Sequence, residues 1–258
     1  MKYCRLSIKE NSFISENIIN LISNNYPIPV TEINSEDCFF LGGPANYLNF
    51  LDEIKKVNGN YINIDKGYFS TSPKVSSHFR LTYNDLQMRK CIEVDDNRLK
   101  KFNIELSPWN KSGSYIMILA PNANPLKFYE NCDIINWITT VKKELLKLTD
   151  RKIFVRYKDN KKIRSYDPLK KYFNDCYCII TLQSLGSVEA TINGIPCINL
   201  APSCLQGLHN MTLNNIESLT YPDNRYEWLK TLSYCQFTYD EFKNGSAMHI
   251  LEKYQKGN

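Results

Sequence analysis

The stretch TLQSLGSVEATINGIP, residues 181–196, decides the fold of this 258-residue chain. It continues the apolar run CYCII, which is typical of a buried strand in a parallel sheet. The small residues of 184–187 indicate a turn that opens a helix, and Gly194 allows the chain to leave that helix. Pro196 then starts another apolar run, PCINL. The segment therefore predicts a strand, a turn, a helix and a second strand.

The residues on the N-terminal side of this segment repeat the same alternation. Strands are expected within SYIMILAPN and KIFVRYKD, residues 114–122 and 152–159. A long amphipathic helix is expected over 128–148 and a short helix over 167–175. Strands that alternate with helices over this length predict a doubly wound parallel sheet.

The first part of the chain predicts a smaller and less regular α/β domain. The apolar run at 36–43, helical spacing over 45–56 and a strand at 60–65 indicate one βαβ unit. SPWNKSGS, at 107–114, is expected to link the two parts. The resulting prediction is an N-terminal domain over 1–110, a second domain over 111–222, and a helical tail over 223–258 that packs back across both halves.

Composition narrows the class of protein. Hydrophobic residues make up 43% and the net charge is +5, which is ordinary for a globular chain. No apolar run or N-terminal leader indicates a membrane segment or secretion. The nine cysteines form no CxxC pair, no Asp-x-Asp triplet occurs, and the three histidines lack ligand spacing. We therefore expect a cytoplasmic protein with no membrane partner and no metal.

The turn before the second-domain helix is the candidate anion site. Backbone N–H groups at a helix start lack intrahelical partners and lie at the positive end of the dipole, which suits a diphosphate. Ligands of parallel sheets also sit at the carboxyl ends of strands. Glu189, in the first turn, can accept hydrogen bonds from the two hydroxyls of a ribose. Alternatively, Glu189 only completes a capping pattern with Ser187 or Gly186.

The same segment resembles the donor-site segment of GT-B glycosyltransferases, and the resemblance covers residues 113–205. It implies a GT-B-like α/β fold in which two Rossmann-like halves face a cleft, the N-terminal half being reduced. It also implies a basic residue at the end of an earlier strand that holds the diphosphate, here Arg156 or Lys158. The residues that carry the resemblance are Ser184, Gly186, Ser187, Glu189, Ala190, Gly194 and Pro196, and the implied donor-binding residues are Arg156, Lys158, Ser184, Leu185, Gly186, Ser187 and Glu189.

A carboxylate in the first domain is the candidate general base. Asp65 ends a predicted strand beside a glycine turn, where it could take the proton of an acceptor hydroxyl, although such a residue can also simply cap a turn. IDKGYF, HFRLTYNDLQ and residues 224–247 resemble glycosyltransferases encoded by tailed bacteriophages, some of which modify hydroxymethylated bases in DNA. That resemblance implies an acceptor side made of Gly43, Tyr68, His78, Arg80 and Asn84, with Tyr68 available to stack on an extruded base.

These features together predict a metal-independent hexosyl- or pentosyltransferase that needs no cofactor. It would move a sugar from a nucleotide-diphosphate sugar, expected to be a UDP-sugar, to a hydroxymethylated pyrimidine in double-stranded phage DNA, in the cytoplasm of the host. One alternative acceptor is a surface or capsular glycan. The other alternative is a nucleotide-binding module without catalysis.

Overall fold

The strands of the computed structural model form two separate sheets, one in each of two units. Unit 1 comprises Met1–Lys101 and Leu229–Asn258, and unit 2 comprises Phe102–Trp228. The boundaries expected at residues 110 and 222 both fall inside unit 2. No helix among the described residues is long and apolar enough to cross a membrane. The structure describes residues 2–6, 18, 22, 28–30, 32–42, 47–69, 78–157 and 168–256.

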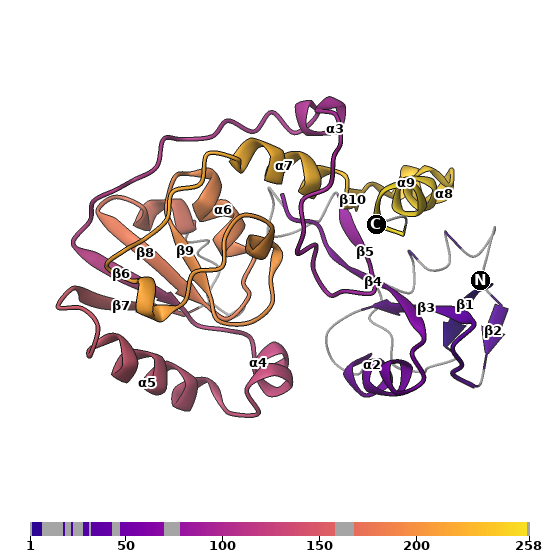
Figure 1. Cartoon of the computed structure of the whole chain (residues 1–258), viewed down its shortest axis with the longest axis horizontal. Helices are drawn as coiled ribbons and strands as arrows, with labels where there is room; N and C mark the ends of the chain where they lie inside the picture. The colour runs from indigo at the N-terminus through magenta and orange to yellow at the C-terminus, as the bar shows by residue number, and fades with distance from the viewer. Residues whose placement is uncertain are drawn as a thin grey trace. The chain divides into compact units, whose positions relative to one another are not determined.

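Unit 2 is built on a four-stranded parallel sheet, as predicted (Figure 1). The sheet order is β7-β6-β8-β9, so the chain starts in the interior of the sheet, moves to one edge and then crosses to the other side. Such a reversal creates a crevice between the carboxyl ends of β6 and β8, where ligands of open α/β sheets bind. The strands are β6 (Tyr115–Leu119), β7 (Lys152–Arg156), β8 (Cys176–Thr181) and β9 (Cys197–Asn199).

Helices cover both faces of this sheet because side chains alternate along each strand. Ile116 and Ile118 of β6 lie in a core cluster with the apolar side of α5 (Ile134–Leu145). Leu119 points to the other face, where it packs against the start of α6 (Gly186–Ile192). The structure therefore has the doubly wound character that the sequence predicts for this half.

Two predicted helices of unit 2 differ from the structure. The long helix expected over 128–148 is interrupted, giving α4 (Ala123–Tyr129) and α5. Asn131 adopts a left-handed φ of 48°, and Asp133 caps α5 by accepting from the backbone N–H of Asn136 at 2.8 Å. The helix expected over 167–175 is only the 3-10 turn η1 (Leu169–Tyr172).

The stretch expected to be a linker is attached to unit 2. The backbone N–H of Ser107 donates to the carbonyl of Ile192, and that of Asn110 donates to the carbonyl of Gly194. Gly194 has a φ of +80°, and a Cβ added there would lie 2.0 Å from the carbonyl oxygen of Pro108. Only glycine fits this close approach after α6.

An arginine ties the same stretch to the end of α6. Arg225 begins α7 (Arg225–Ser233) and is buried. Its guanidinium donates to the carbonyls of Thr191 and Ser107 at 3.0 and 2.9 Å, and lies 3.9 Å from the ring centroid of Trp109. A planar fork of donors is needed to bond two carbonyls while stacking on an indole.

Unit 1 contains a six-stranded mixed sheet in the order β10-β5-β4-β3-β1-β2. The strand pairs among β1 to β4 are parallel, and the crossover through α2 confirms the predicted βαβ unit. Strands β5 and β10 are antiparallel additions at one edge. The elements are β1 (Lys2–Leu6), β2 (Ile28–Val30), β3 (Asp37–Gly42), α2 (Tyr47–Lys56), β4 (Asn60–Lys66), β5 (Phe79–Tyr83) and β10 (Gln236–Phe237).

The C-terminal tail completes unit 1. Besides β10, it supplies α8 (Tyr239–Lys243) and α9 (Ser246–Gln255) (Figure 1). Arg98, in α3 (Asn97–Lys100), is buried, donates to the carbonyls of Ser233 and Gln236, and forms an ion pair with Glu241. Apolar side chains of α8 and α9 share one core cluster with β3, β4 and β5.

Candidate functional site

The turn between β8 and α6 is closed by its own serine. The backbone N–H of Ser184 donates to Oγ1 of Thr181 at 3.3 Å, and that of Gly186 donates to Oγ of Ser184 at 3.2 Å. The N–H of Ser187 donates to the Ser184 carbonyl at 3.0 Å. The expectation that these amides lie bare is therefore wrong for all three residues, because the Thr181 hydroxyl and the hydroxyl and carbonyl of Ser184 satisfy these donors locally.

Packing also limits access to this turn. A Cβ added at Gly186 would lie 2.9 Å from Leu119 Cδ1 and 3.1 Å from Leu169 Cδ2. Ser187 has no exposed surface, and its Oγ donates to the Ser184 carbonyl at 2.8 Å. Leu185, the N-cap residue of α6, is half-buried and makes no side-chain cap. The turn thus fixes where α6 begins, close to the carboxyl end of β6.

Two predicted donor-site residues from different elements lie close enough to interact electrostatically. Arg156 is the last residue of β7, and Glu189 lies in the first turn of α6. Partial burial raises the pKa of the Glu189 carboxyl, while the Arg156 guanidinium and the backbone N–H and charge of Lys170 act in the opposite direction. Glu189 as a residue is exposed, so its carboxylate can meet a ligand. The guanidinium of Arg156 also lies 5.6 Å from the ring centroid of Tyr172.

The capping alternative for Glu189 has no support in the structure, because α6 has no side-chain cap and its N-cap residue is Leu185. Lys158, the second predicted phosphate ligand, lies outside the described residues, and so does Gly43 of the predicted acceptor side.

The candidate base is held by an arginine on the neighbouring strand. Asp65 on β4 and Arg80 on β5 are cross-strand partners, and Oδ2 of Asp65 lies 2.6 Å from Nη2 of Arg80. The other carboxylate oxygen accepts from the backbone N–H of Lys66 at 2.7 Å. The side chain of Asp65 is 41% exposed, whereas that of Arg80 is 6% exposed.

Two more predicted acceptor-side residues lie near this ion pair. Tyr68 is buried, the Arg80 guanidinium lies 5.3 Å from its ring centroid, and its Oη accepts from the Met88 N–H at 2.8 Å. The carbonyl of His78 accepts from the N–H of Gly67, and partial burial lowers the pKa of the His78 ring, with Glu241 opposing. A buried Tyr68 is placed to support Arg80, and stacking on a base would require its exposure.

Asn84 lies at the other end of the same strand pair. Its neighbour Tyr83 pairs with Ile62, near the start of β4, whereas Asp65 lies near its end. Asn84 has a φ of 53°, and its Oδ1 accepts from the backbone N–H of Tyr61 at 2.8 Å. The side chain therefore stabilises a turn, well away from Asp65.

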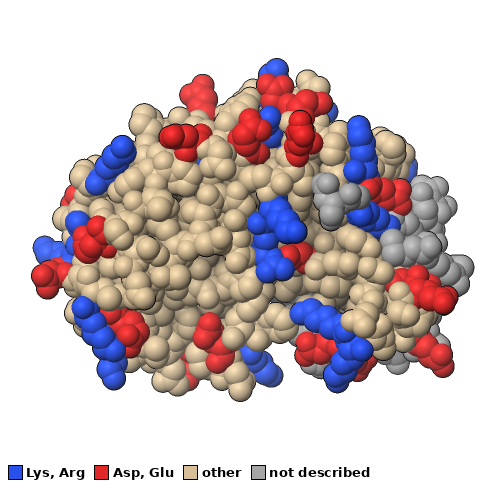
Figure 2. Space-filling view, viewed as in Figure 1, with Lys and Arg blue, Asp and Glu red and all other residues tan. Residues whose placement is uncertain are grey.

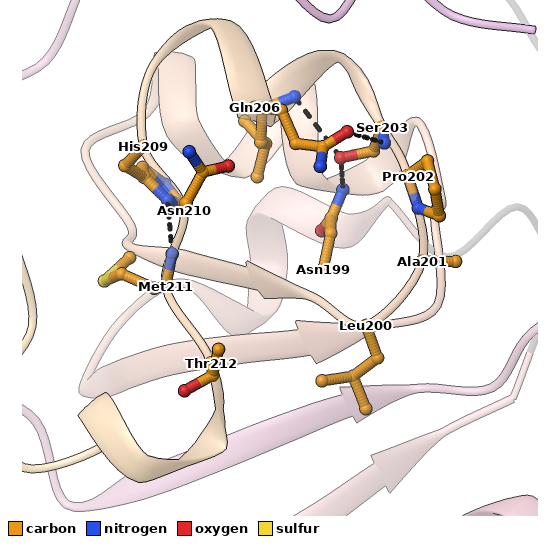
Figure 3. A pocket seen from close by; sticks show the side chains of 11 residues that line it. Asn199, Leu200, Ala201, Pro202, Ser203, Gln206, His209, Asn210, Met211 and Thr212 are labelled. Atoms are coloured by element: carbon orange, nitrogen blue, oxygen red, sulfur yellow. Dashed lines mark hydrogen bonds between the residues drawn. The ribbon is translucent and has the colours of Figure 1, made fainter.

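A pocket follows β9, in the loop after the last strand of the unit 2 sheet. It has a volume of about 230 Å³ and is lined by residues within 199–212 (Figure 3). Asn199, the last residue of β9, donates from Nδ2 to Oγ of Ser187 at 3.2 Å and to Oγ of Ser203 at 2.6 Å. These two bonds join the pocket to the start of α6. A polar residue at the carboxyl end of a buried strand was the signal that could have found it.

Comparison with solved structures shows a fold that this chain shares with a known protein. No protein-family model matches the chain, and no curated protein matches it. Among solved structures, the chain is similar to Thermosulfurimonas dismutans KpsC, a beta Kdo 2,7 transferase, with 11% identity, a TM-score of 0.50, and coverage of 95% of this chain and 100% of that chain. The KpsC beta Kdo 2,4 transferase of the same organism is 8% identical, with a TM-score of 0.48 and coverage of 97% and 98%. The chain therefore shares the fold of the beta Kdo 2,7 transferase over nearly its whole length.

Proposed function

We propose that this protein is a glycosyltransferase that moves a sugar from a nucleotide-diphosphate sugar to an acceptor hydroxyl. The observation that carries the proposal is the fold shared with a sugar transferase over 95% of the chain. The electrostatic influence of Arg156, the last residue of β7, on the carboxyl of Glu189 in α6 supports it. A GT-B-like arrangement, with two Rossmann-like halves facing a cleft and unit 1 as the reduced half, is part of the proposal.

The donor site in this proposal lies in unit 2. Arg156 binds the diphosphate through its guanidinium, Lys158 is proposed as a second phosphate ligand, and Glu189 accepts hydrogen bonds from the ribose hydroxyls. The positive charges stabilise the departing diphosphate electrostatically, so the step requires no metal. The tightly packed turn at Gly186 keeps α6, and with it Glu189, at a fixed distance from the strand ends. A UDP-sugar is the first donor to test.

Catalysis in this proposal uses Asp65. The acceptor oxygen forms a bond to the anomeric carbon while the bond from that carbon to the diphosphate breaks. Asp65 takes the proton of the acceptor hydroxyl as general base. Arg80 orients the carboxylate through one oxygen, and the exposure of Asp65 leaves the group accessible to an acceptor.

A glycan hydroxyl is the acceptor we favour over a modified base in DNA. Duplex DNA is bound through clustered Lys and Arg side chains that neutralise successive phosphates. On the face shown in Figure 2, basic and acidic side chains are interspersed, with acidic groups beside the larger basic ones. The fold shared with a Kdo transferase also fits a glycan acceptor. A hydroxymethylated pyrimidine stays the alternative.

Donor binding tests the proposal first. Calorimetric titration of the full chain with UDP and a panel of nucleotide sugars should show binding that Glu189→Ala weakens at least tenfold. Glu53→Ala, an exposed change on α2, is the matched control and should bind as the unmodified protein does. If Glu189→Ala bound these nucleotides as tightly as the unmodified protein does, the proposed donor site would be wrong. Binding without transfer or hydrolysis across the whole panel would favour a nucleotide-binding module.

Radiolabelled donor identifies the acceptor. The protein is incubated with surface glycans, with duplex DNA that contains hydroxymethylated pyrimidines, and with unmodified DNA. Label in the glycan alone supports the favoured acceptor, whereas label in modified DNA alone overturns it. Binding to DNA that falls steeply with salt would be a further sign of a phosphate-backbone partner.

A further inference from the structure

The pocket that follows β9 lies entirely in unit 2. It is formed where the chain leaves β9 and passes through η2 (Cys204–Gly207). Figure 3 shows Asn199 and Ser203 on one side of it, with His209, Asn210 and Met211 on the other. Its volume of about 230 Å³ is below the roughly 300–1,000 Å³ of pockets that take drug-sized ligands. The pocket therefore has room for one ring, but not for a whole nucleotide sugar.

The wall of this pocket is uncharged near neutral pH. Its described lining residues include no Lys, Arg, Asp or Glu. Burial lowers the pKa of His209, the one titratable group among them, to about 4. An ionised ligand group that entered the pocket would lose part of its hydration without gaining a counter-charge. The wall therefore selects against phosphates and carboxylates.

Two polar atoms of the lining residues are buried without a hydrogen-bond partner in the part of the chain that the structure describes: Oδ1 of Asn199 and Nε2 of His209. The Asn199 amide cannot turn around without cost, because its Nδ2 donates to Ser187 and Ser203. Nδ1 of His209 accepts from the backbone N–H of Met211 at 3.5 Å, which leaves the proton of the neutral ring on Nε2.

These atoms are an acceptor and a donor that lack partners. A buried polar group without a hydrogen-bond partner is unfavourable, and both of these atoms belong to residues that line the pocket, where the hydroxyls of a ligand can supply the missing bonds. A hydroxyl both donates and accepts, and Leu200 and Met211 offer apolar contacts to the C–H groups of a ring. Uncharged sugars combine these properties.

We propose that this pocket binds an uncharged sugar ring, whose hydroxyls donate to Asn199 and accept from His209. The bond from Asn199 to Ser187 places this ring beside α6, the helix that carries Glu189. This inference rests on the function proposed above: the sugar bound here is the one that the enzyme transfers. The preferred donor therefore carries a neutral sugar. A sugar with a carboxylate is excluded by the uncharged wall.

A pair of substitutions at His209 separates the bond to the ligand from the bond within the fold. In His209→Asn, the side-chain oxygen can still accept from Met211, but the Nε2 donor is lost. In His209→Gln, the longer amide can place a donor near the former Nε2. His249→Asn, on the exposed side of α9 in unit 1, is the control. Asn210→Trp fills the pocket from an exposed lining position.

Saturation-transfer difference NMR on the full chain tests the pocket with glucose, N-acetylglucosamine and glucuronic acid. The two neutral sugars should give signals that fall at least fivefold in His209→Asn and Asn210→Trp and persist in His209→Gln and His249→Asn. Circular dichroism verifies that each variant is folded. A glucuronic acid signal as strong as the neutral ones, or neutral signals unchanged in both His209→Asn and Asn210→Trp, would overturn the proposal.

The affinity for nucleotides distinguishes this inference from the donor site. UDP-glucose should bind more tightly than UDP, whereas UDP-glucuronic acid should bind no more tightly than UDP. The affinity gained from glucose should be about tenfold, as expected for one hydrogen bond, and His209→Asn should remove only this gain. If UDP does not bind at all, the donor site fails, while the free-sugar signals still decide the pocket. If UDP binds and the glucose group adds no affinity in any variant, the proposed sugar pocket is wrong, while the proposed donor site is still supported.

Discussion

The guanidinium of Arg80 is sealed inside unit 1, whereas the carboxylate of Asp65, 2.6 Å from it, is open to solvent. The two residues are direct cross-strand partners on β4 and β5. Because neighbouring strands fix both backbones, the ion pair orients the carboxylate without covering it. An accessible, fixed carboxylate is the arrangement that a general base requires.

Asp65→Asn should keep the shape of this site and remove the proton acceptor. We expect kcat for sugar transfer to fall about 10²–10⁴-fold, the usual contribution of general base catalysis, with the dissociation constant of the donor unchanged. Asp52→Asn, an exposed change on α2, is the control. A kcat within twofold of the unmodified enzyme would show that Asp65 is not the base.

The pH dependence of donor binding should depend on Glu189. The ionised carboxylate accepts from the ribose, and its pKa is raised by partial burial, against the influence of Arg156. Donor affinity should therefore be full at neutral pH and begin to fall, as the pH is lowered, above the usual pKa of 4.5. Glu189→Gln should bind more weakly and flatten this fall, whereas Glu53→Gln should keep it. An identical fall in Glu189→Gln would assign the titration to another group.

The stability of unit 2 should depend on pH through His209. Its pKa in the folded protein is about 4, below the unfolded value of 6.5, so the unfolded chain binds the proton more tightly. The contribution is complete above pH 6.5 and is lost as the pH falls toward 4, by about 3 kcal/mol in total. Urea unfolding between pH 7 and 5 should show about 2 kcal/mol of this loss in the unmodified protein and in His249→Asn. If His209→Asn shows the same loss, other groups must be responsible.

Gly194 and Gly245 form a matched pair for backbone strain. Both have a left-handed φ, of +80° and +83°, but a Cβ at Gly245 meets nothing within 4 Å, whereas one at Gly194 meets the Pro108 carbonyl. Gly245→Ala should lower the free energy of unfolding by about 1–2 kcal/mol, from the backbone conformation alone. Gly194→Ala should cost roughly 2 kcal/mol more, because the chain must also move apart. Equal losses in urea unfolding would mean that the contact with Pro108 yields easily.

Arg225→Lys should show that the bond to two carbonyls needs a guanidinium. A lysine can reach only one of Ser107 and Thr191 while remaining near Trp109, so one buried carbonyl loses its partner. We expect a loss of about 2 kcal/mol in urea unfolding. Arg89→Lys, at an exposed ion pair with Asp85, should change stability by no more than about 0.5 kcal/mol. A loss at Arg225 as small as that at Arg89 would contradict this role.

Much of the fold could be predicted because the periodicity of apolar residues and the positions of turn residues indicate the same elements. The apolar run that ends at Thr181, the turn after it and Gly194 gave the strand, helix and strand that the structure shows. The interruption between α4 and α5 was not predicted, because apolar residues keep a helical spacing through Asn131. The left-handed φ of Asn131 is set by the local fold. The antiparallel pairing of β5 with β10 joins residues far apart in the chain, and no local pattern encodes it.

The candidate site was predictable only in part. The resemblance to GT-B glycosyltransferases selected Arg156 and Glu189, and the two residues lie close enough to interact electrostatically, while their roles in donor binding stay predictions. The accessibility of the turn amides could not be read from the sequence, because it depends on the rotamer of Ser184. Asn84 was grouped with Asp65 because the register of β4 and β5 was unknown. His209 lies in an irregular stretch, where the sequence gives no geometry.

The discontinuity of unit 1 has a consequence for how the chain folds during translation. Unit 2 leaves the ribosome as one uninterrupted segment, but the first 101 residues must wait for residues 229–258 to gain the edge strand β10 and the apolar faces of α8 and α9. At roughly 5–20 residues per second, that wait is on the order of ten to thirty seconds. During this interval the N-terminal sheet lacks its edge strand and part of its apolar cover, which are the features that expose a nascent chain to aggregation.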